Sequence, residues 1–154
     1  MNRAQLAPCV AGFRAALLTA RIWTFVSVLS VLGRRCSVPR LLRLCALRAP
    51  CPPEDDAFVV ACVESVLARH PGMPRSPCLK RSLTLYRFLG GPASDLEFCL
   101  GVRYAEGQRP GHQPRQLEGH AWLLRDGAPY LELDHPHGRR FRLIYRHPAR
   151  EGAA

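Results

Sequence analysis

A cysteine, a histidine and two carboxylates stand where this sequence can assemble a nucleophilic site. Cys78 follows Ser76 and Pro77 in "RSPCLKRSLTLYRFLGG", residues 75–91, which has the features of a helix start. The partial positive charge of a helix N-terminus favours a thiolate and can lower a cysteine pKa well below about 8.5. The unpaired amides of the same turn can hold the oxyanion that forms when a thiolate attacks an amide. The first turn of this helix can therefore both stabilise the thiolate of Cys78 and hold the oxyanion.

A cysteine nucleophile also needs a base and a group that orients the base. His120 lies in a stretch that predicts a strand, and Glu132 and Asp134 follow it closely. A two-residue turn at residues 126–127 directs both acids away from the imidazole. A three-residue loop, with Gly127 left-handed in a bulge, instead places Glu132 opposite His120. Asp134 is then the diagonal neighbour on the same face. From spacing alone, a structural role for each of these residues also stays open.

The elements that must position these residues follow from periodicity and from turn residues. One helix is predicted to begin at Pro52 and Pro53 and to end at "RHPG", residues 69–72, and a second is predicted from Ser76 to Gly90. The apolar period then changes from 3.6 to two. Strands are predicted over residues 96–104, 119–124, 129–133 and 140–145, with a loop over 105–117. Helices followed by strands indicate an α+β fold.

The basic charge of the chain is concentrated in its first third. Residues 1–50 carry eight arginines and no acid, and the whole chain has a formal net charge of +10. Such a block suits a nucleic acid, an anionic membrane surface or an acidic peptide, and arginines that merely flank buried helices give the same pattern. Nucleic acid is disfavoured because only Phe13, Trp23 and Phe25 offer rings for stacking.

The apolar stretch over residues 15–32 is expected to form a packed or membrane-surface helix rather than a span. Arg21 interrupts it, and the unbroken part from residue 22 to 32 is shorter than the ~20 residues that a span needs. A signal peptide is disfavoured because "VLGRRC" is a poor cleavage site. We therefore expect a cytoplasmic protein, with peripheral membrane contact through this helix as an open alternative.

Neither the seven cysteines nor the histidines predict a metal site. No pair has CxxC spacing and the number is odd, which argues against a zinc ribbon and a complete disulfide framework. Reduced cysteines, mostly buried, are expected. "DHPH", residues 134–137, matches no strong zinc template and is interpreted as a polar turn. No metal and no cofactor are expected.

Three stretches together resemble a known family. "SPCLKRSLTLYRFL", then "LGVRY", then "GHAWLLRDG" are similar to the lasso-peptide leader peptidases, the B proteins of lasso-peptide biosynthesis, and the resemblance covers residues 52–148. It implies a transglutaminase-like, papain-related fold, in which a cysteine-headed helix packs on an antiparallel sheet. We therefore expect a basic helical segment over 1–50, the protease domain over 51–148 and a disordered tail over 149–154.

The resemblance also implies an activity, a set of catalytic residues and partners. A cysteine protease of this family removes the leader from a precursor peptide before a lasso cyclase closes the macrolactam. Cys78 is then the nucleophile and His120 the general base and acid. The family's acid is usually an aspartate about a dozen residues after the histidine; Glu132 holds that position here, with Asp134 as the second candidate. A separate leader-recognition protein is expected as a partner, and no nucleic acid.

Two other functions remain open. An acyltransferase on the same fold would pass the thioester to an amine instead of water. A non-catalytic binding module would use only the basic N-terminal helices, and its binding would not change when Cys78 is replaced.

Overall fold

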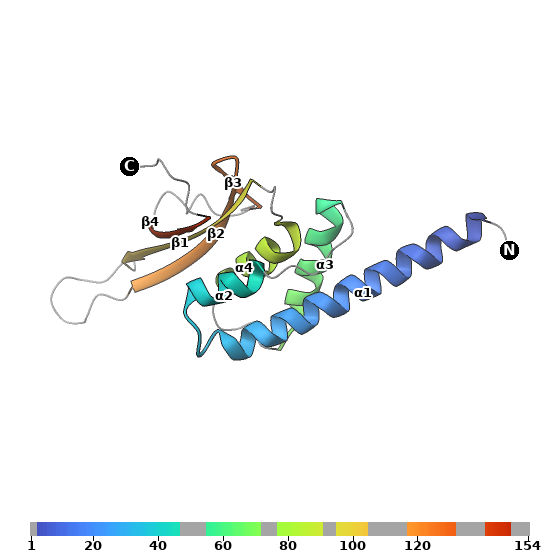
Figure 1. The fold of residues 1–154 in the computed structure, drawn as a ribbon, viewed down its shortest axis with the longest axis horizontal. Helices are drawn as coiled ribbons and strands as arrows, with labels where there is room; N and C mark the ends of the chain where they lie inside the picture. Colours follow the sequence, from blue (N-terminus) through green and yellow to red (C-terminus); the bar gives the residue numbers. More distant parts are fainter. Residues whose placement is uncertain are drawn as a thin grey trace. The chain divides into compact units, whose positions relative to one another are not determined.

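The computed structural model describes residues 3–46, 55–71, 77–90, 95–104, 117–131 and 141–148, with side chains in the first segment from residue 12 to 45. The chain forms two compact units, Met1–Leu89 and Gly90–Ala154. The first unit holds the helices and the second an antiparallel sheet (Figure 1). The predicted α+β class is confirmed.

The first unit consists of four helices. They are α1 (Arg3–Leu32), α2 (Val38–Ala46), α3 (Asp56–Arg69) and α4 (Pro77–Leu89). Helix α4 begins and ends where the sequence predicts. Helix α3 begins later than predicted, because Asp55 is its N-cap and accepts a hydrogen bond from the amide of Ala57 at 3.3 Å. The two prolines predicted to open it lie outside the described residues.

The core of the helical unit is built around one face of α1. Leu18, Ile22, Val26 and Leu29 follow each other at helical spacing and are all buried. Helix α1 contacts α3 and α4, whose buried side chains include Val63. Helix α1 packs against these helices along one side only, and several apolar residues on its other side are exposed.

By length and composition alone, residues Gly12–Leu32 of α1 are able to cross a membrane. A buried core helix or a signal sequence passes the same test, so this is weak evidence. The finding is compatible with a soluble protein and with a membrane-associated one.

The second unit is a four-stranded antiparallel sheet in the order β3-β2-β1-β4. The strands are β1 (Leu96–Tyr104), β2 (Leu117–Arg125), β3 (Ala128–Tyr130) and β4 (Arg142–His147). Four strands are thus predicted in the right places, although β3 is shorter and β4 begins and ends two residues later. Most of the predicted loop between β1 and β2 lies outside the described residues.

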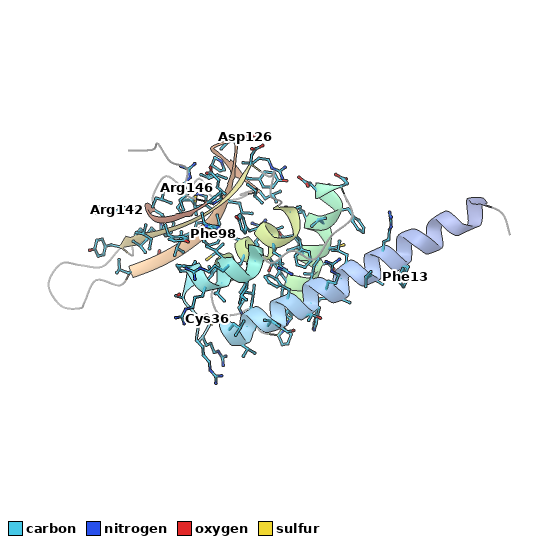
Figure 2. The ribbon with its side chains drawn as sticks, viewed as in Figure 1. Phe13, Cys36, Phe98, Asp126, Arg142 and Arg146 are labelled. Carbon is cyan, nitrogen blue, oxygen red and sulfur yellow. The ribbon has the colours of Figure 1, made fainter. Side chains whose placement is uncertain are left out.

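The β2–β3 hairpin has the two-residue turn. Arg125 pairs with Ala128, and both intervening residues have positive φ, 52° at Asp126 and 77° at Gly127. Two left-handed residues define a type I′ turn, for which Asp-Gly is a preferred sequence. Asp126 lies at the tip of this hairpin (Figure 2). The three-residue bulged loop that would have placed Glu132 opposite His120 is therefore wrong for this hairpin.

Regular pairing in the hairpin stops just before the two candidate acids. Tyr130 is the last residue of β3 and pairs with Leu123, and Leu131 has a φ of 60°. A left-handed bulky residue breaks the alternation of a strand, so the register of β3 cannot be extended past it. Glu132 and Asp134 both lie outside the described residues.

Candidate functional site

Cys78 is the second residue of α4 and lies in its first turn. The amides of this turn have no partners within the helix, and the turn contains no acidic residue. The side chain is half-buried, and Cys78 is in no disulfide. The sequence prediction for Cys78 as the head of a helix is confirmed, and the N-terminus of a helix is a place that favours an anion.

Side-chain contacts hold α4 in place within the helical unit. One turn after the cysteine, the Nε of Arg81 donates to Glu64 Oε1 of α3 at 2.7 Å. Near the other end, Arg87 Nη1 donates to the carbonyl oxygens of Leu44 and Cys45 at the end of α2, at 3.0 and 3.3 Å. These contacts tie α4 to two other helices, so the position of Cys78 is fixed by the fold.

Two other thiols show the opposite environment. Cys45 and Cys99 are buried. Burial raises the pKa of Cys45 to about 12 and that of Cys99 to about 11, with nearby arginines opposing the shift in both cases. These two groups are neutral hydrophobic side chains at physiological pH. Among the five cysteines whose side chains the structure describes, Cys78 is the one in the first turn of a helix.

Cationic groups lie near the beginning of α4. Burial lowers the pKa of Lys80, and the charge of Arg34 lowers it further. Burial likewise lowers the pKa of His70, with a smaller contribution from Lys80. His70 is itself held by Ser27, whose Oγ lies 3.0 Å from its Nε2. The region near the first turn of α4 thus disfavours additional positive charge, through burial first and through neighbouring cationic groups second.

His120 lies on β2, as predicted, and its ring is packed against two aromatic rings. The Trp122 ring is stacked with it, with centroids 5.9 Å apart and planes 15° from parallel. The Phe141 ring lies 5.1 Å away, tilted by 32°. Trp122 is buried and His120 half-buried, so the imidazole is positioned by the rings and still reached by solvent.

Gly101 leaves the space that these rings occupy. It pairs directly with His120 in the β1–β2 ladder. A Cβ built on it would lie 2.9 Å from the Cη2 of Trp122, closer than real contacts allow, and a tight 3.0 Å from the Cβ of Phe141 and from the backbone oxygen of Arg142. The pairing of β1 with β4 also shifts between Leu100 and Gly101. A glycine at this position is therefore needed for the packing around the histidine.

An outer pair of charges supports the same cluster. The guanidinium of Arg103 lies over the Phe141 ring, 4.8 Å from its centroid. Its Nε donates to Glu118 Oε2 at 2.8 Å. Sequence analysis missed Phe141, Gly101 and this ion pair as supports of the histidine. The only early signal was a glycine in the middle of a strand, which often marks a bulge or a close approach.

The predicted site residues fall into three groups. Cys78 belongs to the helical unit Met1–Leu89 and His120 to the sheet unit Gly90–Ala154. Glu132, Asp134 and the rest of "DHPH" lie outside the described residues. Within the described residues, no group of three His, Cys, Asp or Glu side chains is arranged to hold a metal ion.

Comparison with known proteins decides the family. A model described as transglutaminase-like superfamily matches residues 20–146, which is most of the chain. The chain belongs to the transglutaminase-like superfamily. This superfamily includes cysteine proteases and acyltransferases, so the expected fold is confirmed and the expected chemistry is supported at that level. Comparisons with curated proteins and with solved structures gave no match.

Within this transglutaminase-like chain, the family match begins inside α1. Only the later part of that helix, residues 20–32, is thus in the matched region. The division into a segment over 1–50, a domain over 51–148 and a tail over 149–154 stays a prediction.

Proposed function

We propose that this transglutaminase-like protein is a cysteine peptidase that removes the leader from a lasso-peptide precursor. The observation that carries the proposal is the half-buried Cys78 in the first turn of α4, in a chain of this superfamily. The stretches "SPCLKRSLTLYRFL", "LGVRY" and "GHAWLLRDG", which resemble the leader peptidases, give the substrate class.

The proposed reaction is amide hydrolysis through a thioester. The Sγ of Cys78 attacks the carbonyl carbon at the end of the leader, and amides of the first turn of α4 stabilise the oxyanion. Protonated His120 gives its proton to the departing amine, which is the new N-terminus of the core peptide. His120 then takes a proton from water, and the resulting hydroxide attacks the thioester. The leader leaves as a carboxylic acid and Cys78 is regenerated.

A carboxylate completes the proposed triad. Glu132 is the first candidate and Asp134 the second, by their distance in sequence from His120. Either one would hold the imidazole in the tautomer that accepts the thiol proton. The proposed partners are the precursor peptide, a separate leader-recognition protein and the lasso cyclase that uses the released amine. Location in the cytoplasm follows from these partners.

The experiment is a processing assay with a lasso-peptide precursor as the substrate and with a leader-recognition protein added. Mass spectrometry should detect separate leader and core peptides with the wild type and none with Cys78→Ala. Cys62→Ala is the matched control, because Cys62 is also a half-buried cysteine on a helix and is also in no disulfide. Processing by Cys78→Ala at the wild-type rate would overturn the proposal, and would favour a binding module.

The acyltransferase alternative shares every step up to the thioester and differs in the second nucleophile. The same assay with an added primary amine separates the two. A leader that ends in a carboxylic acid supports the peptidase, whereas a leader amide of the added amine as the main product supports an acyltransferase.

A further inference from the structure

Helix α1 has an exposed apolar face in addition to the face that it buries. We define the α1 stripe as the apolar residues Phe13, Leu17, Val28 and Val31 together with the hydroxyl-bearing Thr24, which are all exposed and lie on one side of the helix. Phe13 is 69% exposed and Val31 60%. At about 1.5 Å per residue, the stripe is about 27 Å long. Several exposed apolar side chains gathered on one side of a helix are a feature of interaction surfaces.

Arginines surround the α1 stripe. Arg14 lies beside its first residue, and Arg34 and Arg35 follow its last. All three are exposed, and residues 1–50 contain no acid to neutralise them. Apolar side chains flanked by arginines suit the interface of an anionic bilayer, where the chains enter the acyl boundary and the guanidinium groups stay at the headgroups.

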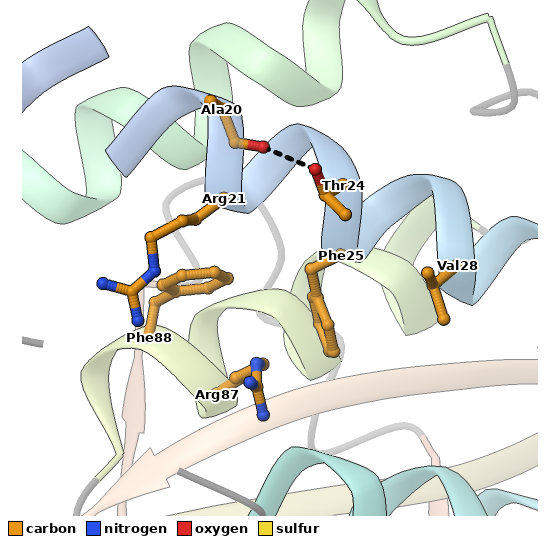
Figure 3. A pocket seen from close by; sticks show the side chains of 7 residues that line it. All are labelled: Ala20, Arg21, Thr24, Phe25, Val28, Arg87 and Phe88. Atoms are coloured by element: carbon orange, nitrogen blue, oxygen red, sulfur yellow. Dashed lines mark hydrogen bonds between the residues drawn. The ribbon is translucent and has the colours of Figure 1, made fainter. Parts of the chain in front are cut away.

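A groove of about 380 Å³ opens in the middle of the α1 stripe, between α1 and α4 (Figure 3). Thr24 and Val28 of the stripe line it. Its other lining residues are Ala20, Arg21, Phe25, Arg87 and Phe88, which include two arginines and no acid. The guanidinium of Arg87 donates to carbonyl oxygens at the end of α2, so Arg21 is the arginine offered to a lipid phosphate, beside apolar side chains suited to the upper acyl chain.

The aromatic rings of this region do not serve nucleic acid. Phe25 packs edge-on against Phe88 at 5.8 Å and carries the guanidinium of Arg87 at 4.9 Å. Trp23 packs against the ring of His70 at 4.9 Å. Both rings are engaged within the helical unit, so no row of rings is left for stacking with bases.

We propose that the α1 stripe docks the protein on the surface of an anionic phospholipid bilayer, with α1 lying in the plane of the membrane. The opposite face of α1 indicates that the helix lies on the bilayer and does not cross it. Ile22 and Val26 are fully buried there, in the core shared with α3 and α4. A spanning α1 would have to leave this core, whereas a helix that lies on the surface keeps it. The proposal is independent of the peptidase activity.

Vesicle flotation of the full chain tests this docking. Wild type should float with vesicles of phosphatidylcholine containing about 30% phosphatidylglycerol, weakly with pure phosphatidylcholine, and less at high salt. Leu17→Glu with Val31→Glu should lower the partition coefficient at least about tenfold. Arg21→Gln should lower it less. The matched control is Leu143→Glu with Ile144→Glu, two residues of similar exposure on β4, and it should bind like wild type.

Thermal unfolding of each variant shows whether it is folded, and the comparison uses variants that melt like wild type. Failure of wild type to float, equal binding to neutral and anionic vesicles, or unchanged binding of the stripe variant would overturn the proposal. Retention of α1 in the bilayer after alkaline carbonate extraction would also overturn it, in favour of a span. The proposal would also be overturned if wild type binds no vesicles, forms a dimer in solution, and loses that dimer in the stripe variant.

Discussion

Gly101 pairs with His120 across the β1–β2 ladder, and a Cβ at Gly101 would lie 2.9 Å from the Trp122 ring that stacks on the imidazole. The smallest residue of one strand thus sets the position of the proposed base on the next. The packing around His120 therefore depends on a residue of β1 that lies well before His120 in the sequence.

Gly101→Ala should impair processing more than it impairs folding. The added methyl group has to displace Trp122 or Phe141, and overpacking of this kind costs about 1–3 kcal/mol of stability. The moved rings carry the imidazole with them, so the rate of leader removal should fall at least about tenfold at a temperature where the variant is folded. Rate and urea unfolding are measured on the same preparation.

Gly119→Ala is the matched control for this change. Gly119 precedes His120 on β2, and a Cβ there meets nothing within 4 Å. The Gly119→Ala variant should remove the leader at close to the wild-type rate. Equal losses in the two glycine variants would show that the rings do not position the base.

The candidate acids are separated by isosteric replacement. Glu132→Gln should reduce the rate of leader removal roughly a hundredfold or more, because an amide no longer favours the protonated imidazole. Asp134→Asn should reduce it less than about threefold. The reverse order would assign the role to Asp134, and wild-type rates in both variants would exclude a triad formed with either residue.

Thiol labelling should separate the buried Cys45 and Cys99 from the half-buried Cys78. With pKa values raised to about 12 and about 11, fewer than about one in a thousand of the Cys45 and Cys99 thiols are ionised at pH 7.5. Iodoacetamide should therefore modify Cys78 in the folded protein and reach Cys45 and Cys99 only in guanidinium chloride. Peptide mass spectrometry locates the label. Labelling of Cys45 as fast as Cys78 would contradict the described burial.

The free energy of unfolding should fall on mild acidification because of His70. Its folded pKa lies below the ordinary 6.5, so the unfolded chain binds the proton more tightly. The stabilisation that neutral His70 contributes is fully present above about pH 6.5. It declines as the pH falls toward the folded pKa of His70 and is lost below that pKa. Urea unfolding at pH 7.5 and pH 5.5 should show a smaller difference in His70→Gln than in wild type. An equal difference would assign the acid sensitivity to other groups.

Local patterns predicted most of the elements. Alternation over residues 96–104 gives the bounds of β1, and Pro77 with the following glycines gives those of α4. The hairpin register was open because Asp126 and Gly127 suit either loop length, and two positive φ angles decided it. Phe141, just before β4, contacts His120 of β2 from a distant part of the sequence, so no local pattern contains this contact.

The most direct test of the central claim is the pH dependence of Cys78 alkylation, measured in wild type and in His120→Gln. If the imidazole stabilises the thiolate, wild-type Cys78 should still react quickly near pH 6, and His120→Gln should move the midpoint up toward about 8.5. The same midpoint in both proteins would contradict a site in which His120 activates Cys78.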